Sequence, residues 1–482
     1  CLSLGNSCNY ECRIGRTIAN SWSDQTAPEV NQERDHPQSL DNKDIDPMKH
    51  KAEKGAMMLC LLLLTPIFSI QAAAPDLSKV ATQADIEAVI ASTKDAGLKK
   101  SLAHHADVIL AAAKRHPHVK EVMRTIESAP GAYTKINTTP EALKKAAGGE
   151  IAIFDTLTAM STSIMNGKAH AYRDAKDDPY DAAFIEHLGH ISSLESVKIV
   201  ATKIDDSWLP PLLNLKSLKS FSMEGTARGL KGNPSLGDLS LARLQTLEQC
   251  SGLSSLELAY FGRATDAGLE KLAGLKNLES FTFRGSPIKG HGFAKFQGWT
   301  KLKRINFHSN SLDDEGFGHV CAQFPNLEFI KLWHSKLLTD ASAEHFKKLK
   351  KLTGIEISCS KSTAGLIRHL SELPMEYMAL EYGVNSPANE AIDTMKAIPT
   401  LRRLKLACNS ITDANLSALA GLSQVQELTL SDLDLPVSRI PQLRSFSHLK
   451  TLSLVRYGKG YPEEIQAKIK AILPKVDVQF VK

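Results

Sequence analysis

The sequence predicts an α/β solenoid, with parallel strands on a concave face and helices on a convex face. The first observation is a repeated motif, L-x-x-L-x-L, in which Val, Ile, Phe or Met replaces some of the leucines. The second is the spacing, because successive motifs begin 23 to 26 residues apart except for one interval of 35 residues. A fixed period in this range is typical of units that stack side by side into a solenoid. The motifs begin at Leu194, Leu218, Leu253, Leu278, Leu302, Leu327, Leu352, Met375, Leu401, Val425, Leu449 and Leu473.

Each unit is expected to supply one short strand and one outer helix. With the first leucine of a unit as position 1, positions 1, 4, 6 and 11 point into the core, and the strand covers roughly positions 3 to 7. Because side chains alternate along a strand, positions 3, 5 and 7 face the concave side. A Thr-Asp pair then caps the helix, as in Thr265–Leu269. Position 9 can satisfy backbone groups at the turn where it carries Asn, Ser or Thr, at Thr202, Thr226, Ser286, Asn310, Ser335, Ser360 and Asn409.

The repeats occupy residues 181–482 and predict a domain of about twelve strands. At about 4.8 Å between neighbouring strands, such a sheet extends over roughly 50–55 Å. The interval of 35 residues contains extra residues around Gly229–Gly237, which we interpret as a loop inserted on one rim.

These residues resemble the bacterial leucine-rich repeats of the T-D-x-G-L type, as in Thr265–Leu269, with equivalent signals at Asp313-Asp314, Thr339-Asp340 and Thr412-Asp413. They are similar to the ribonuclease-inhibitor-like and F-box-associated cysteine-containing repeats. The resemblance implies a horseshoe with the parallel sheet inside, helices outside and a partner bound to it. It does not imply one activity. Related exported chains carry haem domains, but this sequence has no C-x-x-C-H motif and no recognisable F-box segment.

The first 73 residues differ from the rest of the chain. Residues 1–47 are polar and rich in Asn and Asp, so we expect a disordered or upstream segment, with Met48 as the natural start. Residues 48–73 read as a signal peptide, with lysines followed by the apolar run Met57–Ile70 and the small residues Ala72–Ala74. The apolar run is too short to span a bilayer comfortably. We therefore expect export to the periplasm or the extracellular space, with no stable membrane insertion after cleavage.

Residues 74–180 lack the repeat and read as a mostly helical N-terminal cap. Thr82 and Asp85 form a capping-box pattern before a helix, and apolar residues at helical spacing continue through residues 95–126. Thr139 and Pro140 begin a further short helix, and Ile151–Phe154 reads as a strand. The end of a solenoid needs such a cap because a terminal repeat cannot bury its own face.

The middle units predict a binding surface on the concave face. Their positions 3, 5, 7 and 8 combine aromatic rings with charged side chains, whereas the outer units carry mainly Ser and Thr there. Aromatic and Arg side chains surrounded by polar groups are typical of the residues that carry most of an interface's energy. We expect the ring of Trp333 to lie outside the core and to anchor a partner. The candidate residues are Arg284, Arg304, His308, Phe329, Lys331, Trp333, His334, Glu356, Tyr377, Glu381, Tyr382, Arg403 and Lys405.

The sequence offers little for catalysis or for a metal. It contains no H-E-x-x-H, Walker or G-x-S-x-G motif. The histidines at His104-His105, His116–His118 and His187–His190 are expected to face solvent rather than to ligate a metal, which needs three or four convergent ligands. Cys250, Cys321, Cys359 and Cys408 are expected to be free structural thiols. We expect no cofactor, and the net charge of +5 without a basic patch disfavours nucleic acid.

The preferred hypothesis is an exported, non-catalytic leucine-rich-repeat protein that binds a protein partner on its concave face. One alternative is a hydrolase or carbohydrate-active enzyme that uses the groove, which a set of convergent acids or a metal would favour. The other is an intracellular adaptor similar to the F-box-associated repeats, which an uncleaved N-terminus would favour.

Overall fold

The computed structural model describes residues 75–129, 131–163, 178–201, 204–225, 233–381, 388–407 and 411–482. From Asp76 onward these residues belong to one compact unit, Asp76–Lys482. The segments expected at 1–47 and 48–73 lie outside the described residues. Among the described helices, none combines the length and the apolar composition that crossing a membrane requires.

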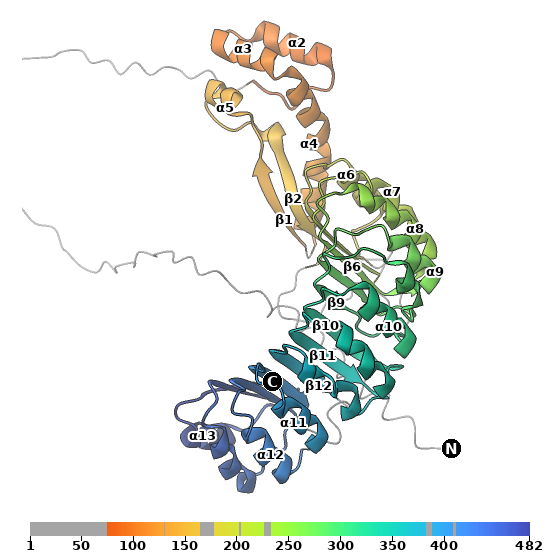
Figure 1. Cartoon of the computed structure of the whole chain (residues 1–482). Coiled ribbons are helices and arrows are strands. Elements are labelled where there is room, and N and C mark those ends of the chain that lie inside the picture. Colours follow the sequence, from red (N-terminus) through yellow and green to blue (C-terminus); the bar gives the residue numbers. More distant parts are fainter. Residues whose placement is uncertain are drawn as a thin grey trace, which may run out of the picture. The chain divides into compact units, whose positions relative to one another are not determined.

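One sheet of fourteen described strands runs through this unit, and its spatial order follows the sequence (Figure 1). The first two strands, β1 (Ala132–Asn137) and β2 (Asp155–Ser161), are antiparallel, and all later neighbours are parallel. Twelve strands lie in the repeats, one for each motif. They are β3 (Ser196–Ala201), β4 (Ser220–Gly225), β6 (Ser255–Ala259), β8 (Ser280–Arg284), β9 (Arg304–Asn306), β10 (Phe329–Ser335), β11 (Gly354–Cys359), β12 (Tyr377–Glu381), β13 (Arg403–Ala407), β14 (Glu427–Ser431), β15 (Thr451–Val455) and β16 (Asp477–Val481).

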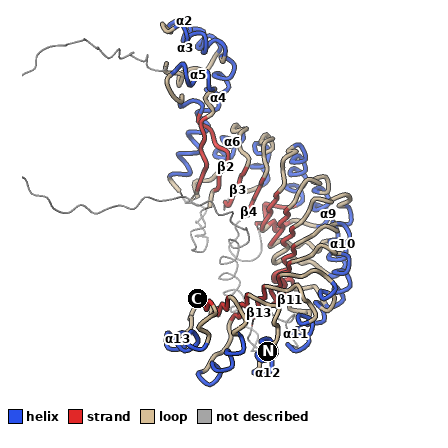
Figure 2. Tube along the Cα trace, turned by 60° about the vertical axis from the view of Figure 1, so that its left-hand side comes forward, coloured by secondary structure: helices blue, strands red, loops and turns tan. Residues whose placement is uncertain are grey.

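Short helices line the outer side of the curved sheet, and the strands line the inner side (Figure 2). The predicted α/β leucine-rich-repeat solenoid, with strands on the concave face and helices on the convex face, is therefore confirmed. The outer helices and turns are α6 (Ala182–Gly189), η2 (Asp206–Trp208), α7 (Leu209–Leu212), α8 (Asp238–Leu244), η3 (Gln245–Gln249), α9 (Asp266–Leu269), η4 (Glu270–Leu272), η5 (His291–Lys295), α10 (Asp314–Gln323), η6 (Asp340–Lys348), η7 (Ala364–Ile367), η8 (Leu370–Glu372), α11 (Ala388–Lys396), α12 (Asp413–Ala420), η10 (Val437–Phe446) and α13 (Glu463–Ile472).

The predicted register of the repeats holds from β3 to β15. Position 3 of each unit pairs with position 3 of the next, as Ser255 does with Ser280 and Tyr377 with Arg403. The last unit is the exception. Asp477 pairs with Thr451, so the motif start predicted at Leu473 is two residues too early. The reason is that α13 ends at Ile472, and Leu473 packs in the core before the strand begins.

A single hydrophobic core extends along the solenoid from α4 to β16. Leu, Ile, Val and Phe at positions 1, 4 and 6 meet the apolar faces of the outer helices there. The units around β8–β10 contain a cluster of aromatic rings whose centroids lie 4.8 to 6.4 Å apart, a separation at which edge-to-face contacts are favourable. The continuous core fixes the strands relative to one another and therefore fixes the side chains on the concave face.

The N-terminal region is less purely helical than expected. It contains α2 (Gln83–Ser92), α3 (Ala96–His104), α4 (Ala106–Glu127) and α5 (Glu141–Ala147), but β1 and β2 also extend the solenoid sheet. Residues 152–154, expected in a strand, form a 3-10 turn, and β2 begins only at Asp155.

Helix α4 connects this region to the repeats. Its first half packs in a separate N-terminal core with Ile109, and its second half packs in the solenoid core with Val119 and Val122. The N-terminal region therefore covers the apolar end of the first repeat.

The T-D-x-G-L pattern has a physical explanation in contacts between adjacent units. The backbone N–H and the hydroxyl of Thr265 donate to the two carboxylate oxygens of Asp238 in the preceding unit, at 2.7 Å each. A Cβ atom on Gly268 would lie 2.9 Å from the Cα of Asp238, so a side chain there would clash with backbone. Thr363 repeats the contact with Asp340 at 2.8 and 2.5 Å. The Thr-Asp pair thus joins neighbouring helices, a role beyond the predicted cap within one helix.

The insertion in the 35-residue interval is more ordered than a rim loop. Within its described part, β5 (Asn233–Gly237) pairs in parallel with β7 (Phe261–Arg263) and forms a second, two-stranded sheet. The preceding residues, 226–232, lie outside the described residues.

The strands end in a repeated left-handed turn at position 8. Four non-glycine residues with positive φ occupy this position: Tyr260 (61°), Ser309 (57°), His334 (54°) and Asp432 (55°). Position 9 continues the turn as predicted at Asn310, whose Oδ1 accepts the backbone N–H of Ser286 at 3.0 Å. Ser360 is exposed, so this position 9 contact does not extend to β11.

Candidate binding surface

The position 3 residues of β9 to β13 form a row on the concave face, which we call the aromatic ledge and define as Arg304, Phe329, Gly354, Tyr377 and Arg403. The guanidinium of Arg304 lies 4.4 Å from the centroid of the Phe329 ring, and that of Arg403 lies 5.1 Å from the Tyr377 ring. The two rings are nearly parallel, with an angle of 9° and centroids 6.3 Å apart. Both arginines are exposed and both rings are half-buried. The ledge therefore presents two cations and two aromatic rings to the concave side.

Gly354 makes this arrangement possible. It lies between the strands that carry the two rings, and it has no side chain to separate them. A Cβ atom at this position would lie 2.8 Å from Cδ2 of Phe329 and 3.7 Å from Cδ1 of Tyr377. Gly354 was not among the residues predicted from the sequence. A glycine at position 3 between two units with aromatic residues at position 3 nevertheless indicates that the two rings can approach each other.

Positions 5 and 7 of the same strands form a second group, which we call the charged layer and define as Lys331, Trp333, Glu356, Glu381 and Lys405. The ammonium of Lys331 pairs with Glu356 at 2.8 Å, and the side chains are only 19% and 7% exposed. The ammonium groups of Lys331 and Lys405 lie 5.5 and 5.8 Å from the centroid of the Trp333 ring. Such cation–π contacts are stronger when water is excluded. The charged layer is thus an ordered polar structure on the concave side.

The expectation that the ring of Trp333 is available to a partner is wrong. Trp333 is 2% exposed, although it lies outside the hydrophobic core of the solenoid. We attribute this burial to neighbours such as Lys331 and Lys405, whose ammonium groups lie close to the ring, because long side chains bury their apolar stems against an aromatic surface. Glu356, Glu381 and Lys405 are also buried, at 6%, 4% and 2% exposure. They support the surface from below rather than forming it.

Burial also opposes ionisation within the charged layer. Burial raises the pKa of the Glu381 carboxyl and lowers the pKa of the Lys405 ammonium on the neighbouring strand. Burial likewise raises the pKa of the Tyr377 hydroxyl, which donates to Glu356 at 3.2 Å. The Tyr377–Glu356 hydrogen bond connects the ledge to the charged layer.

Arg284 belongs to a third group, closer to the N-terminal end of the sheet. Its guanidinium donates to Glu224 at 2.8 Å and lies 3.5 Å from Glu257, and it also donates to the Tyr260 hydroxyl at 3.2 Å. Its side chain is only 18% exposed. Arg284 was predicted as a binding residue, but its hydrogen-bond donors are engaged inside the protein. None of its three partners, Glu224, Glu257 and Tyr260, was among the predicted residues.

The remaining predicted residues lie at the ends of the strands. The rings of His308 and His334 contact each other edge to face, with centroids 5.2 Å apart. Burial holds the pKa of His308 well below its usual value and lowers that of His334 to about 4. His334 occupies the left-handed turn position, so its placement reflects the turn as well as the surface. Tyr382 lies outside the described residues.

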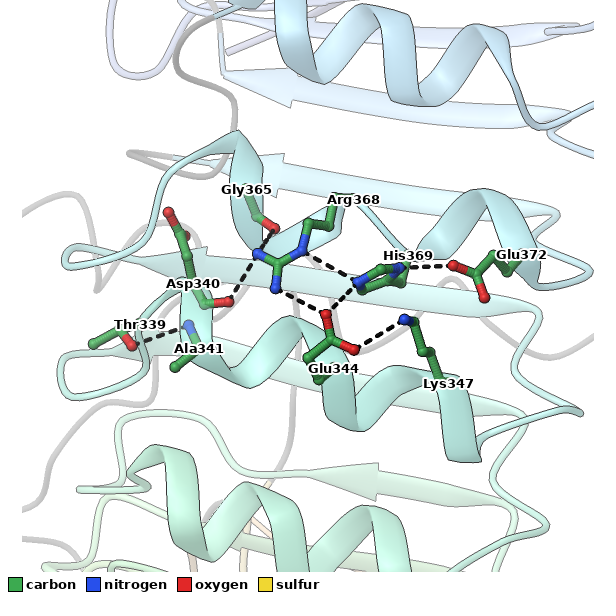
Figure 3. Close-up of polar contacts among 9 residues, drawn as sticks. All are labelled: Thr339, Asp340, Ala341, Glu344, Lys347, Gly365, Arg368, His369 and Glu372. Carbon is green, nitrogen blue, oxygen red and sulfur yellow. Dashed lines mark hydrogen bonds and ion pairs between the residues drawn. The ribbon is translucent and has the colours of Figure 1, made fainter.

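A separate polar cluster lies on the convex side, between η6 and η7–η8 (Figure 3). Glu344 accepts from Lys347, Arg368 and His369 at 2.9, 3.1 and 2.7 Å, and the hydrogen bond from Lys347 is the largest cause that lowers its pKa to about 2. His369 also contacts Glu372 at 2.7 Å. Glu344 is 55% exposed, and exposed ion pairs of this kind stabilise a protein only weakly. The cluster joins adjacent outer helices, and its groups satisfy one another.

The histidines do not simply face solvent as expected. Nδ1 of His118 on α4 lies 2.8 Å from Nδ1 of His187 on α6, and the ring of His118 stacks on that of His190 at 4.0 Å. Across the described residues, no group of three or more His, Cys, Asp or Glu side chains has the geometry to hold a metal ion. Cys250, Cys321 and Cys359 are buried free thiols, and Cys408 lies outside the described residues.

Comparisons with known proteins give partial matches. No family model matches the chain. Over 33% of its length the chain is 28% identical to a disease resistance protein of Arabidopsis thaliana, covering 18% of that protein. Over 32% it is 28% identical to human lumican, covering 49% of lumican. The chain thus spans less than half the length of either curated relative.

Two solved structures match part of the chain. An internalin from Listeria monocytogenes matches with a TM-score of 0.35 and 16% identity, over 61% of this chain and 82% of the internalin. TLR13 in its ssRNA13 complex matches with a TM-score of 0.38 and 15% identity, over 61% of this chain and 43% of TLR13. Because both scores are low, the fold assignment depends on the repeat register. The twelve in-order strands and their outer helices make this chain a leucine-rich-repeat solenoid.

Proposed function

We propose that this protein is an exported, non-catalytic leucine-rich-repeat protein that binds a protein partner through the aromatic ledge on its concave face. The observation that carries the proposal is the exposure of Arg304 and Arg403, each stacked on an aromatic ring, with the Tyr377 ring held by a hydrogen bond to Glu356 of the charged layer. Arg and aromatic side chains held rigidly in this way lose little entropy when a partner docks.

A binding role fits the chemistry of the concave face better than catalysis does. The buried Glu356 is paired with Lys331 and accepts from Tyr377, so it is not available as a general base. Glu381 is buried, and a general base must come within hydrogen-bond reach of the proton that it abstracts. The ledge itself offers aromatic rings, guanidinium groups and the hydroxyl of Tyr377, and this hydroxyl donates to Glu356 and has a raised pKa, which disfavours a nucleophilic role.

The binding proposal is tested by alanine substitution along position 3. Phe329→Ala and Tyr377→Ala should each weaken the partner complex by about 2 kcal/mol, as expected for central aromatic contacts. Thr451→Ala changes the same position in an outer unit and should leave the affinity unchanged. Isothermal titration of the purified partner measures all three. Loss of binding only after changes in the β5 region would contradict the proposal.

Export is tested on the chain expressed from Met48. The charged residues after Met48 and the apolar run Met57–Ile70 motivate this part of the proposal. N-terminal sequencing should find a mature terminus near Ala73 in protein recovered outside the cytoplasm. An intact Met48 terminus in the cytoplasmic fraction would instead favour the adaptor alternative.

A further inference from the structure

We infer that the partner presents an extended acidic segment to the ledge, with two carboxylates separated by apolar or aromatic residues. This inference rests on the proposed binding function and specifies the chemistry of the bound segment. It comes from what the two ledge arginines contact and from the distance between them.

The two exposed ledge arginines differ from Arg284 and Lys331, which are less exposed cations of the concave face. Arg284 and Lys331 both have carboxylate partners within 2.8 Å. Among the described residues, Arg304 and Arg403 have no carboxylate within ion-pair distance, although Glu427 lies beside Arg403 in the sheet. Their contacts are the faces of aromatic rings, which leave the N–H groups at the guanidinium edge available. A guanidinium held in this way is suited to bind a carboxylate through two parallel hydrogen bonds.

The spacing of the arginines sets the length of the bound segment. Arg304 and Arg403 are four strand steps apart in the sheet, through β10, β11 and β12. At about 4.8 Å per step, their backbones are separated by roughly 19 Å. An extended peptide advances about 3.3 Å per residue, so carboxylates about five or six residues apart can reach both arginines.

The rings define what lies between the two carboxylates. Phe329 and Tyr377 occupy the middle of the ledge, and Gly354 leaves no polar side chain between them. A segment that crosses them buries apolar or aromatic side chains most favourably, because stacking on the rings adds to the gain from burial.

The charges around the ledge favour an acidic peptide over single-stranded nucleic acid. A nucleic acid carries a phosphate at every nucleotide and is bound by a continuous positive groove. Here only the two ends of the ledge are cationic. Glu427 lies beside Arg403, and Glu356 and Glu381 lie beneath the middle. A phosphate at every nucleotide would place negative charge over the rings of Phe329 and Tyr377, whereas a peptide with acids at its two ends places negative charge only at Arg304 and Arg403.

The inference is tested with the full chain on an array of synthetic peptides, each about nine residues long and varied in the number and spacing of carboxylates. Peptides with two carboxylates five or six residues apart and an aromatic centre should bind most tightly. Arg304→Ala and Arg403→Ala should each weaken those peptides about ten-fold, as loss of a charge-assisted pair does. Thr451→Ala, in an outer unit, should preserve the preference.

Three other results would overturn the inferred acidic segment. Peptides that bind equally well without carboxylates, yet weaken with Phe329→Ala, would overturn the acidic segment and leave the proposed function intact. Binding of a mixed-sequence single-stranded oligonucleotide, in an arginine-dependent way and without peptide binding, would replace the inferred ligand by nucleic acid. Binding of neither probe would also overturn the inference. If substitutions in the ledge also leave the affinity for a purified partner unchanged, both the inference and the proposed function are wrong.

Discussion

The aromatic ledge and the charged layer come from the same strands and the same face of the sheet, yet they differ in what is available to a partner. At position 3, the guanidinium groups of Arg304 and Arg403 are exposed and stack only on rings. At positions 5 and 7, Trp333 and Lys405 are each 2% exposed. The direction in which a side chain leaves a strand therefore does not decide whether it is accessible. Neighbouring side chains decide that, because the large ring of Trp333 is covered by the stems of the charged residues beside it.

The largest expected effect is that of Trp333→Ala. Because the ring is buried, its removal should lower the free energy of unfolding by about 3–5 kcal/mol. Trp333→Phe should cost much less, since it keeps a ring and removes an indole N–H that finds no acceptor among the described residues. Urea denaturation followed by circular dichroism gives both values. A loss below about 1 kcal/mol for Trp333→Ala, as for a surface residue, would place Trp333 with the ledge instead.

The next largest effect on stability is expected for a residue that the register of the sheet places in the core. Leu404 is 2% exposed at position 4 of β13, and Leu404→Ala should lower the free energy of unfolding by about 2–5 kcal/mol. Ser453→Ala, at position 5 of β15, should change it by less than about 0.5 kcal/mol. Equal losses in denaturant titrations would mean that the assignment of inward and outward positions is wrong.

The buried His334 predicts that the stability of the protein depends on pH. Burial lowers the pKa of His334 from 6.5 to about 4, so the folded state favours the neutral ring. Its contribution to stability is therefore complete above pH 6.5 and is lost as the pH falls toward 4. Asparagine adopts the left-handed backbone conformation readily, so His334→Asn tests this effect. The variant should lose about 1–3 kcal/mol less free energy of unfolding than the parent as the pH falls toward 4. Unfolding titrations at several pH values measure it, and identical curves for the variant and the parent would contradict the prediction.

A loss of similar size is expected for Gly268→Ala. The new Cβ would lie 2.9 Å from the backbone of Asp238 in the preceding unit, so we expect a loss of about 1–3 kcal/mol from overpacking. Gly252→Ala is the control, because its nearest neighbour would be at an ordinary 3.7 Å. Thermal unfolding compares the two. If Gly268→Ala were as stable as Gly252→Ala, the close approach of Gly268 to Asp238 would not explain the glycine of the motif.

The periodic parts of the fold could be predicted from the sequence. Positions 4 and 6 repeat in every unit and are buried for the same reason each time, so a single alignment of the motif gave the correct register through β15. The last unit broke the rule because α13 and its following turn place Leu473 in the core two residues before position 1. The antiparallel pair β1–β2 carries no repeat, and its strands could not be located by period.

The candidate site was predictable only in part. The periodicity identified which side chains face the concave side, and it placed Arg304 and Arg403 correctly on the exposed row. It could not predict which of those side chains form ion pairs and which stack on aromatic rings. Arg284 depends on Glu224, two strands away in the sheet, and the ledge depends on Gly354, which has no side chain of its own. Such contacts form between units, so the numbering of positions within one unit cannot predict them.

The most direct test of the central claim is the rate at which an arginine-specific reagent such as phenylglyoxal modifies individual arginines, followed by mass spectrometry of the full chain without a partner. Arg304 and Arg403 are exposed and have no carboxylate partner among the described residues, so they should react several-fold faster than Arg284, which is held by Glu224. Equal rates for the three residues, or faster modification of Arg284, would contradict the division of the concave face into an available ledge and a structural layer.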